Sequence, residues 1–483
     1  MTSPKTESAG SRTGPTYLIT SLELFATTAL IAVVSSITSL IVGYPIGNYL
    51  ATLGSRARTL LGSLLVLPFL LPPFLIGITL LPLRGENLDS SFGILLIVLA
   101  HAIMNVGFVA RIVASSQLPL EQLEAARLDG ARNLLIRLRV SLPQQRPALA
   151  AAGLLIALYS ATSYGLVLSL GQGSVSTLET EIAESALRDL DLPRAMALAL
   201  LQTLMTITLF AFAQRAGAKP TPVFGEVQSG LPSRLGALLA AATGLGIAVV
   251  ISNIAVRALT LNDGFFQNLE SLNTKGARQI LNLTVWEAAS NSLRNLIVTA
   301  LLVIPLAWLA SGRAKSSLVY ILPIGISPVV LGLGFLILSG YLPREFAVWW
   351  IVPLVQAIFI FPLAYQIIRP ARLGMNREIL EAAQIDGATK LRVFGSIEGP
   401  ILVRPIAAAA AFVSLASLGE FGAASFLATG TEATLPLVIF RLAARPGEEN
   451  LGMAMTAALL FVLLALLVVL LISRESRTEA RES

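Results

Sequence analysis

The polar residues with the most specific spacing occur in one motif that is present twice. The first copy contains Glu124-Ala125-Ala126, Asp129-Gly130 and, nineteen residues after the glutamate, Pro143. The second copy keeps the same spacing 257 residues later, with Glu381-Ala382-Ala383, Asp386-Gly387 and Pro400. The glutamate can pair with a basic group, the alanines allow close approach of another backbone, and the glycine permits a sharp turn. These properties suit a surface that is presented to a protein partner.

Each copy also has the start and stop signals of a short helix. Pro119 suits the first turn of one helix, Asn376 is a good N-cap for the other, and a glycine follows each. Leu123 and Ala126 lie three residues apart, so part of the helix can be buried. The alternative is an ordinary loop helix with a solvated face. That alternative explains one copy well, but it does not explain two copies in register.

Polar residues inside apolar runs are a second set of functional candidates, because they are costly in a membrane. Glu420, followed by Phe421, interrupts one run, and 257 residues earlier the corresponding pair is Ser163-Tyr164. We expect these two segments to line a pathway near a central interface. The alternative for Glu420 is a glutamate near the outer surface that is hydrogen-bonded to helix ends.

Two further groups of residues allow more than one interpretation. His101, with Asn105 one turn later, fits a packing residue better than a ligand or proton carrier. Ser176 and Glu179 are spaced as a capping box, and Glu179, Glu181 and Glu184 are expected to face the external side, as a docking surface or a solvated face. Prolines break two apolar runs at matching places, as gating kinks or for packing: Pro68, Pro72, Pro73, Pro323 and Pro328.

The composition excludes several classes of protein. Of the 483 residues 55% are hydrophobic and 13% charged, with mean hydropathy +0.77, which indicates an integral membrane protein. The net charge of +6 comes from basic residues in short loops, so no nucleic-acid partner is expected. There is no cysteine and one histidine, so we expect no metal site and no catalytic residues. No Gly-x-x-x-x-Gly-Lys-Ser/Thr phosphate loop occurs, so we expect no cofactor in this chain.

Charge-free runs of about 20 residues predict eleven transmembrane helices. The candidates are Leu24–Leu53, Thr59–Leu83, Ser91–Ala110, Pro147–Leu170, Ala195–Gln214, Leu235–Val256, Asn295–Gly312, Ser316–Leu342, Phe346–Ile368, Pro405–Leu427 and Leu451–Ser473. With both motifs placed in the cytoplasm, the inner segments hold 22 Lys and Arg and the outer ones 12. The N-terminus is therefore expected outside and the C-terminus inside.

The repeat divides the chain into two halves that share one orientation. We expect a disordered tail at 1–16, a first domain at 17–216, a linker with an extra transmembrane helix and an external loop at 217–285, a second domain at 286–474 and a cytoplasmic tail at 475–483. Ala216–Ser233 is the Pro/Gly-rich linker between them.

The repeated motif resembles the EAA loop of ABC-importer permeases, the cytoplasmic loop that docks on the ATPase subunit. The resemblance implies an all-α integral membrane protein of the type I ABC importer (MetI/ModB-like) architecture, with two parallel permease domains related by a pseudo-two-fold axis. It implies a permease without its own ATPase activity in the bacterial inner membrane. It also implies two copies of an ABC ATPase, carrying ATP and Mg, and an external substrate-binding protein as partners. The residues listed above in both motifs, from Glu124 to Pro143 and from Glu381 to Pro400, would couple to the ATPases.

Within that group the chain is most similar to fused, double-length permeases of thiamine and iron(III) importers. Gly93 to Asn105, Val167 to Glu179, and Ser417 to Gly422 with Thr434-Leu435-Pro436 resemble the thiamine type. The chain departs from it by lacking one N-terminal span and by having Glu420 where an aspartate is expected. Thiamine is the favoured substrate and iron(III) the alternative. The alternative class is a proton-coupled secondary carrier that uses Glu420 or His101, although it does not explain two identical loops.

Overall fold

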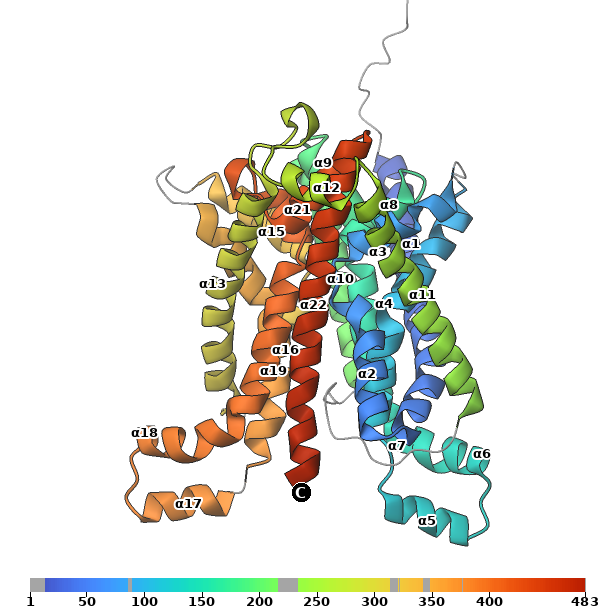
Figure 1. Ribbon diagram of the computed structural model, residues 1–483, viewed down its shortest axis with the longest axis vertical. Helices are drawn as coiled ribbons and strands as arrows, with labels where there is room; N and C mark the ends of the chain where they lie inside the picture. The colour runs from blue at the N-terminus through green and yellow to red at the C-terminus, as the bar shows by residue number, and fades with distance from the viewer. Residues whose placement is uncertain are drawn as a thin grey trace, which may run out of the picture.

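The computed structural model describes residues 14–85, 89–215, 233–312, 320, 322–341, 348–375 and 377–482. Within these ranges the secondary structure is entirely helical, as the composition predicts. Long helices run along the long axis of the molecule, and shorter helices lie at its two ends (Figure 1). The predicted tail at 1–16 and the linker Ala216–Ser233 fall almost wholly outside the described residues.

The first half of the chain is a bundle in which α4 packs against both α1 and α7. Close approach depends on small residues: a Cβ added at Gly107 of α4 would lie 1.8 Å from the Leu65 carbonyl oxygen of α2. The elements are α1 (Gly14–Thr52), α2 (Ser55–Val66), η1 (Leu67–Leu70), α3 (Pro73–Arg84), α4 (Ser90–Ser115), α5 (Leu120–Leu128), α6 (Asn133–Ile136), η2 (Arg137–Ser141), α7 (Leu142–Ala161), α8 (Tyr164–Gly171), α9 (Leu178–Leu187) and α10 (Leu192–Arg215).

The second half repeats this order of elements. The packing repeats too, because α13, α16 and α19 pack on one another as α1, α4 and α7 do, and α15 packs on α20 as α3 packs on α8. The elements are α13 (Val285–Ser311), η4 (Leu322–Gly325), α15 (Pro328–Ser339), η5 (Val348–Trp350), α16 (Ile351–Leu373), α17 (Arg377–Ile385), α18 (Lys390–Val393), η6 (Phe394–Glu398), α19 (Gly399–Leu418), α20 (Gly422–Leu427), η7 (Gly430–Glu432), α21 (Leu435–Ala443) and α22 (Glu448–Glu482).

Between the halves lie α11 (Arg234–Thr260), α12 (Phe265–Ser271) and η3 (Ala277–Gln279). α11 packs against α1 of the first half and α22 of the second, so this additional helix joins the two bundles. Asn268 of α12 is fully buried and donates hydrogen bonds to the carbonyl oxygens of Ala258 and Leu261, at 3.1 and 2.9 Å. These bonds fix the turn that follows α11.

Seven helices are long and apolar enough to cross a membrane, or up to ten if each of three bent helix pairs is one span. The bent pairs are Ser55–Leu70 with Pro73–Arg84, Asn133–Ala161 with Tyr164–Gly171, and Phe394–Val403 with Pro405–Leu418. Ten of the eleven predicted spans correspond to these helices. The eleventh, Ser316–Leu342, lies partly outside the described residues, and its described part contains η4 and the 12-residue α15, which is shorter than a span.

Prolines produce the sharpest of these bends, as the sequence predicts. The chain turns by 90° between η1 and α3. Leu71 is extended there, with ψ 149°, because the Pro72 ring excludes the helical conformation of the residue before it, and Pro73 then opens α3. In the second half Pro328 opens α15 after Ser327, whose hydroxyl accepts the amide hydrogens of Val329 and Val330.

The two ends of the molecule differ. The pairs α5–α6 and α17–α18 project from one end, where the C-terminus also lies, and α9, α12 and α21 lie at the other (Figure 1). The bundles come together at the α9–α21 end and are separate at the loop end. Both copies of the repeat therefore point in the same direction, as direct repeats require.

Candidate coupling loops and translocation pathway

Both repeated motifs form a short helix closed by a left-handed glycine. Gly130 has φ 75° and Gly387 has φ 74°, which residues with a Cβ rarely adopt. One backbone hydrogen bond closes each turn: Ala131 donates to Ala126 at 3.1 Å, and Ala388 donates to Ala383 at 3.0 Å. This is the hydrogen bonding of a Schellman helix end, so the turn predicted at each glycine is confirmed.

The glutamates and aspartates of both motifs are exposed. Glu124 and Asp129 in the first loop face solvent, as do Glu381 and Asp386 in the second. On the other side of α5, Leu123 is buried against Leu118 and Ile136, and this apolar contact holds α5 on α6. Both loops therefore expose acidic residues of a short helix, and in the first loop the opposite face of that helix is anchored.

A π-helical turn, which we did not predict, precedes the proline of each motif. Leu142 donates its amide hydrogen to Arg137, and Gly399 donates to Phe394, in each case five residues back. Pro143 and Pro400 follow and have no amide hydrogen to continue the normal ladder. The wider turn is thus the local consequence of a proline at the start of α7 and α19, and π-turns are frequent at functional sites.

The two loops also carry a matched pair of exposed apolar residues that we did not predict as functional. Leu128 is 88% exposed and Ile385 is 86% exposed, and each lies four residues after the motif glutamate. Each lies beside the exposed acidic residues of its loop, so the two positions are candidates for contact with a partner. The signal was present in the sequence as an apolar residue at the same position of both copies.

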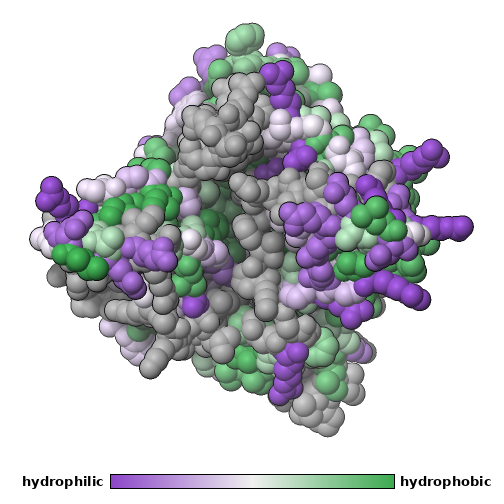
Figure 2. Space-filling view, turned by 90° about the horizontal axis from the view of Figure 1, so that it is seen from below, coloured by the Kyte–Doolittle hydropathy of each residue, from purple (hydrophilic) through white to green (hydrophobic). Residues whose placement is uncertain are grey.

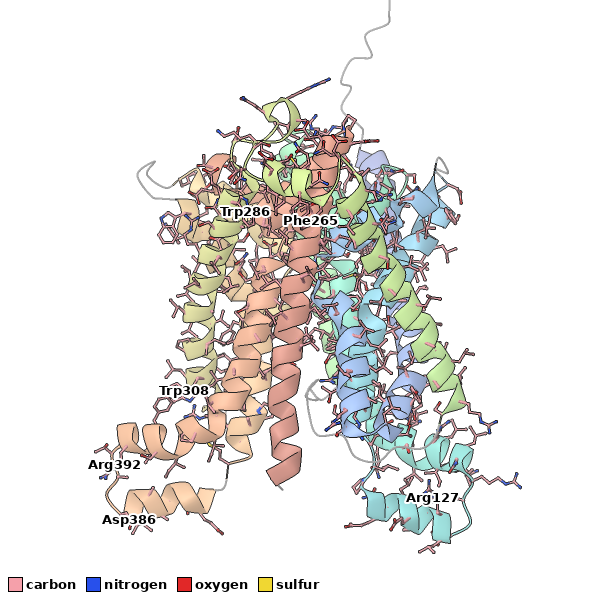
Figure 3. All side chains as sticks on the ribbon, in the orientation of Figure 1. Arg127, Phe265, Trp286, Trp308, Asp386 and Arg392 are labelled. Carbon is pink, nitrogen blue, oxygen red and sulfur yellow. The ribbon has the colours of Figure 1, made fainter. Side chains whose placement is uncertain are left out.

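The second loop has an attachment to its bundle that differs from the first. Arg372 donates to the Trp308 carbonyl oxygen at 2.7 Å and its guanidinium lies 4.9 Å from the Trp308 ring centroid. Phe394 at the start of η6 packs on the same ring, with centroids 4.9 Å apart. Figure 3 shows Trp308 on α13 just above α18. The position 257 residues before Arg372 is Ser115, which offers no guanidinium.

Hydrophilic side chains gather on two lobes at the loop end. Figure 2 shows these lobes from below, separated by a recess with apolar surface inside it. The labelled Arg127 on one lobe and Asp386 and Arg392 on the other lie far apart in Figure 3. The loop end therefore offers two separate polar surfaces, one from each half.

At the opposite end, aromatic side chains from both halves meet. The Phe421 ring lies 5.6 Å from Tyr164, 5.1 Å from Phe74 and 5.0 Å from Phe440, measured between centroids. Tyr164 and Phe421 are the pair related by the repeat, and they stack on each other. A Cβ added at Gly165 would lie 2.9 Å from Phe421, so glycine is needed for this contact. We call Phe74, Tyr164, Phe421 and Phe440 the aromatic cluster.

Glu420 is buried beside this cluster, and its side chain accepts hydrogen bonds at the start of α20. Its two carboxylate oxygens accept the amide hydrogens of Ala423 and Ala424, at 2.6 and 3.1 Å. This agrees with the alternative in which the glutamate is hydrogen-bonded to a helix end. Its role in the pathway remains a prediction.

Glu179 contradicts the expectation that it faces the external side with Glu181 and Glu184. Its side chain is fully buried, and one oxygen accepts from Gln202 at 3.2 Å. The other oxygen has no hydrogen-bond partner among the described residues. Burial raises the pKa of Glu179 to about 8. The Ser327 hydroxyl of the second half, which lies beside the carboxyl without the geometry of a normal hydrogen bond, opposes part of that shift. Capping also differs, because Thr177 rather than Ser176 caps α9, in a reciprocal pair with Thr180.

His101 and Ser163 are both buried. His101 Nδ1 lies 3.2 Å from the Ser35 hydroxyl of α1, and its Nε2 has no partner among the described residues. In the second half Gln356 also links neighbouring helices, because it accepts hydrogen bonds from Thr299 of α13 and Ser417 of α19. These contacts join helices within each half and favour a packing role for His101. Ser163 directly precedes α8, and its buried hydroxyl has no hydrogen-bond partner among the described residues.

Comparison with known proteins decides the family. The model of the binding-protein-dependent transport system inner membrane component matches residues 39–218 and again residues 288–475. The chain belongs to this family. The two matches contain the two loops and the two halves described above, so the chain is a double-length member.

Similar curated proteins include permeases of the same double length. The chain is 27% identical to the thiamine transport system permease protein ThiP of Brucella abortus, over 93% of this chain and 87% of the relative. It is 25% identical to ThiP of Escherichia coli, over 81% and 75%. The molybdenum transport system permease protein ModB of Haemophilus influenzae is 31% identical over 40% of this chain and 90% of its own length.

Membership in the family establishes the general activity. The chain is a multi-pass inner-membrane permease subunit of an ABC importer, and it is not itself the catalytic subunit. The family implies partners of two kinds, an ATPase and a binding protein. The chain is therefore a subunit of an ATP-driven importer, and the alternative interpretation as a proton-coupled secondary carrier is wrong.

Proposed function

We propose that the chain is the permease of a thiamine importer. The observation that carries the proposal is similarity to thiamine permeases along nearly the whole chain, including both halves and the segment between them. The molybdenum permease matches a far smaller share of the chain. The aromatic cluster adds a chemical argument, because thiamine is a planar organic cation and such cations bind well to aromatic faces.

Iron(III) is the weaker alternative. Ferric ions are hard cations that require several oxygen ligands in one place. Among the described residues, no group of three or more His, Cys, Asp or Glu side chains could hold a metal ion. The described residues therefore give no support for a ferric site in the pathway.

Two ATPase subunits would dock on the two loops, one on each. The exposed Glu124 and Glu381 would pair with basic groups of the ATPases, and Leu128 and Ile385 would enter apolar recesses beside them. ATP and Mg would be held by those subunits. The loop end and the C-terminus would then be cytoplasmic and the start of α1 external, in agreement with the excess of Lys and Arg in the inner segments.

The transport cycle follows from the difference between the two ends. With the bundles in contact at the aromatic cluster and separate at the loop end, the pathway would be closed to the outside and open to the cytoplasm. ATP would draw the two ATPases, and hence the two loops, together. Because ATP binds the closed ATPase pair better, it would shift the permease to the outward-open state.

Transport by the purified complex tests the proposal. The chain and its ATPase are placed in proteoliposomes with ATP on the loop side, and binding protein loaded with radiolabelled thiamine on the other side. We expect ATP-dependent accumulation of thiamine. A Glu124→Arg, Glu381→Arg chain serves as the control and should accumulate none. ATP-dependent transport of ferric ions without transport of thiamine would overturn the proposed substrate.

A further inference from the structure

The carboxylate of Glu179 is buried, and its contacts within the described fold account for only one of its two oxygens. It belongs to α9, at the end of the molecule where the two halves meet, and its side chain is 0% exposed. Gln202 satisfies one of its oxygens, and the other has no hydrogen-bond partner among the described residues. An unsatisfied buried carboxylate is costly, so its retention calls for a function.

Three basic side chains at this end of the first half have other partners. Arg188 pairs with Glu184, Arg194 pairs with Glu181, and Arg84 bonds the Leu170 carbonyl oxygen and Ser174. The described ion pairs include neither Glu179 nor Glu420. The interface between the halves therefore contains two carboxyl groups with no cationic side chain paired to them.

The surroundings of Glu179 connect it to the aromatic cluster. The helix that carries Glu179, α9, packs against α8, which begins at Tyr164. It also packs against α15 of the second half, which begins directly after Ser327. The next residues of α15, Pro328 and Val329, are those that a Cβ at Gly422 would meet, at 3.3 Å each. The free carboxylate oxygen and the aromatic rings therefore lie around the same contact between the halves.

We infer that Glu179 and the aromatic cluster form a passage site for a planar organic cation. When the halves separate at this end, the stacked rings of Tyr164 and Phe421 part and expose two aromatic faces, between which a flat cation can lie. Opening of this end exposes the Glu179 carboxyl to water, which removes the burial that keeps it protonated, and the ionised group then supplies the counter-charge. Glu420 is not available for this task in the same way, because both of its oxygens are held by α20 amides.

This inference rests on the proposed function. It states that the permease itself recognises the positive charge of the substrate. The probe is a pair of compounds of the same shape: thiamine, and 3-deazathiamine, in which carbon replaces the charged ring nitrogen. Both are supplied on saturating binding protein to the complex in proteoliposomes, so that selection by the binding protein does not limit the rate. The native chain should transport thiamine about tenfold faster than the neutral analogue.

The decisive variant is Glu179→Gln, which keeps the hydrogen bond to Gln202 and removes the charge. We expect its rates for the two compounds to become equal, through loss of the faster thiamine rate. Glu184→Gln on the same helix is the matched control, since Glu184 is exposed and pairs with Arg188, and it should keep the native ratio. ATPase binding and basal ATP hydrolysis should be native in both variants.

The outcomes separate the two proposals. If the native complex transports thiamine and Glu179→Gln keeps the native ratio, the cation site is wrong and the thiamine importer stands. If the native complex transports neither compound, both proposals fall. Should Glu179→Gln not assemble with the ATPase, Phe421→Leu tests the aromatic part in the same assay. It should slow thiamine more than the neutral analogue, and an unchanged ratio would contradict the inference.

Discussion

At the scale of single residues, glycines set how closely these helices approach. Gly107 of α4 lies against the backbone of α2, where an added Cβ would be 1.8 Å from the Leu65 carbonyl oxygen. Without a hydrophobic driving force between helices in lipid, such close contact is a main source of association. Gly244 of α11 is also within a helix, but nothing lies within 4 Å of a Cβ added there.

This difference predicts opposite results for two identical substitutions. Gly107→Ala should force α2 and α4 apart and destabilise the chain by about 1–3 kcal/mol, as overpacking usually does. Gly244→Ala should leave stability unchanged or slightly raised, because alanine is the better helix former. The apparent melting temperature of the detergent-purified chain measures both. Equal melting temperatures for the two variants would show that α2 and α4 do not pack as described.

The carboxylates illustrate what sequence can and cannot reveal at this scale. Glu420 stands out because apolar residues surround it in sequence, yet the start of α20 uses both of its oxygens. Glu179 sits in a run with Glu181 and Glu184, which makes it look solvated, yet it alone of the three is fully buried. Burial of one face of α9 depends on contact with α15 of the other half, and a pairing over such a distance in sequence leaves no local pattern.

At the scale of elements, the loop turn depends on backbone conformation alone. Nothing lies within 4 Å of a Cβ built on Gly130 or Gly387, so side-chain size is irrelevant there and the positive φ is the whole constraint. Residues with a Cβ lose about 1–2 kcal/mol in this conformation, and asparagine tolerates it best.

A pair of substitutions at one position therefore tests the turn. Gly130→Val should strain the turn and reorient α5, so that less ATPase co-purifies with the chain and coupled ATP hydrolysis falls. Gly130→Asn adds a side chain of similar size, and it should bind ATPase almost as the native chain does. Loss of binding in both variants would mean that the side chain, rather than the left-handed backbone, interferes with docking.

Most elements could be predicted from the sequence, and the exceptions have physical causes. Ten of the predicted spans correspond to described helices or bent pairs, since a long charge-free run has few alternatives to a membrane helix. The run Thr59–Leu83 is uniformly apolar, so hydropathy could not separate η1 from α3, although Pro72 and Pro73 marked the place of the bend. The π-turns were missed because a proline near the start of a helix is also compatible with a normal first turn, so Pro143 and Pro400 alone do not predict the wider one.

At the scale of the whole molecule, the two halves are in contact at one end and separate at the other. The α9–α21 end is held by the aromatic cluster and by α11, which packs on both α1 and α22. The loop end carries α5–α6 and α17–α18 on separate lobes (Figure 2). One chain therefore presents two docking surfaces, whereas a single-domain permease presents one.

This arrangement predicts the stoichiometry of the complex and its dependence on each loop. The native chain should bind two ATPase subunits, measured as the mass of the purified complex.

Leu128→Asp places a charge on the exposed apolar position of the first loop only, and it should reduce the complex to one ATPase. Ile385→Asp should do the same through the second loop. ATP-driven transport should be lost in either variant, because one ATPase cannot draw both halves together. Phe266→Asp, which alters an equally exposed apolar residue of α12 at the opposite end of the molecule, is the control and should bind two. A complex that keeps two ATPases in the Leu128→Asp and Ile385→Asp variants would show that these residues lie outside the contact.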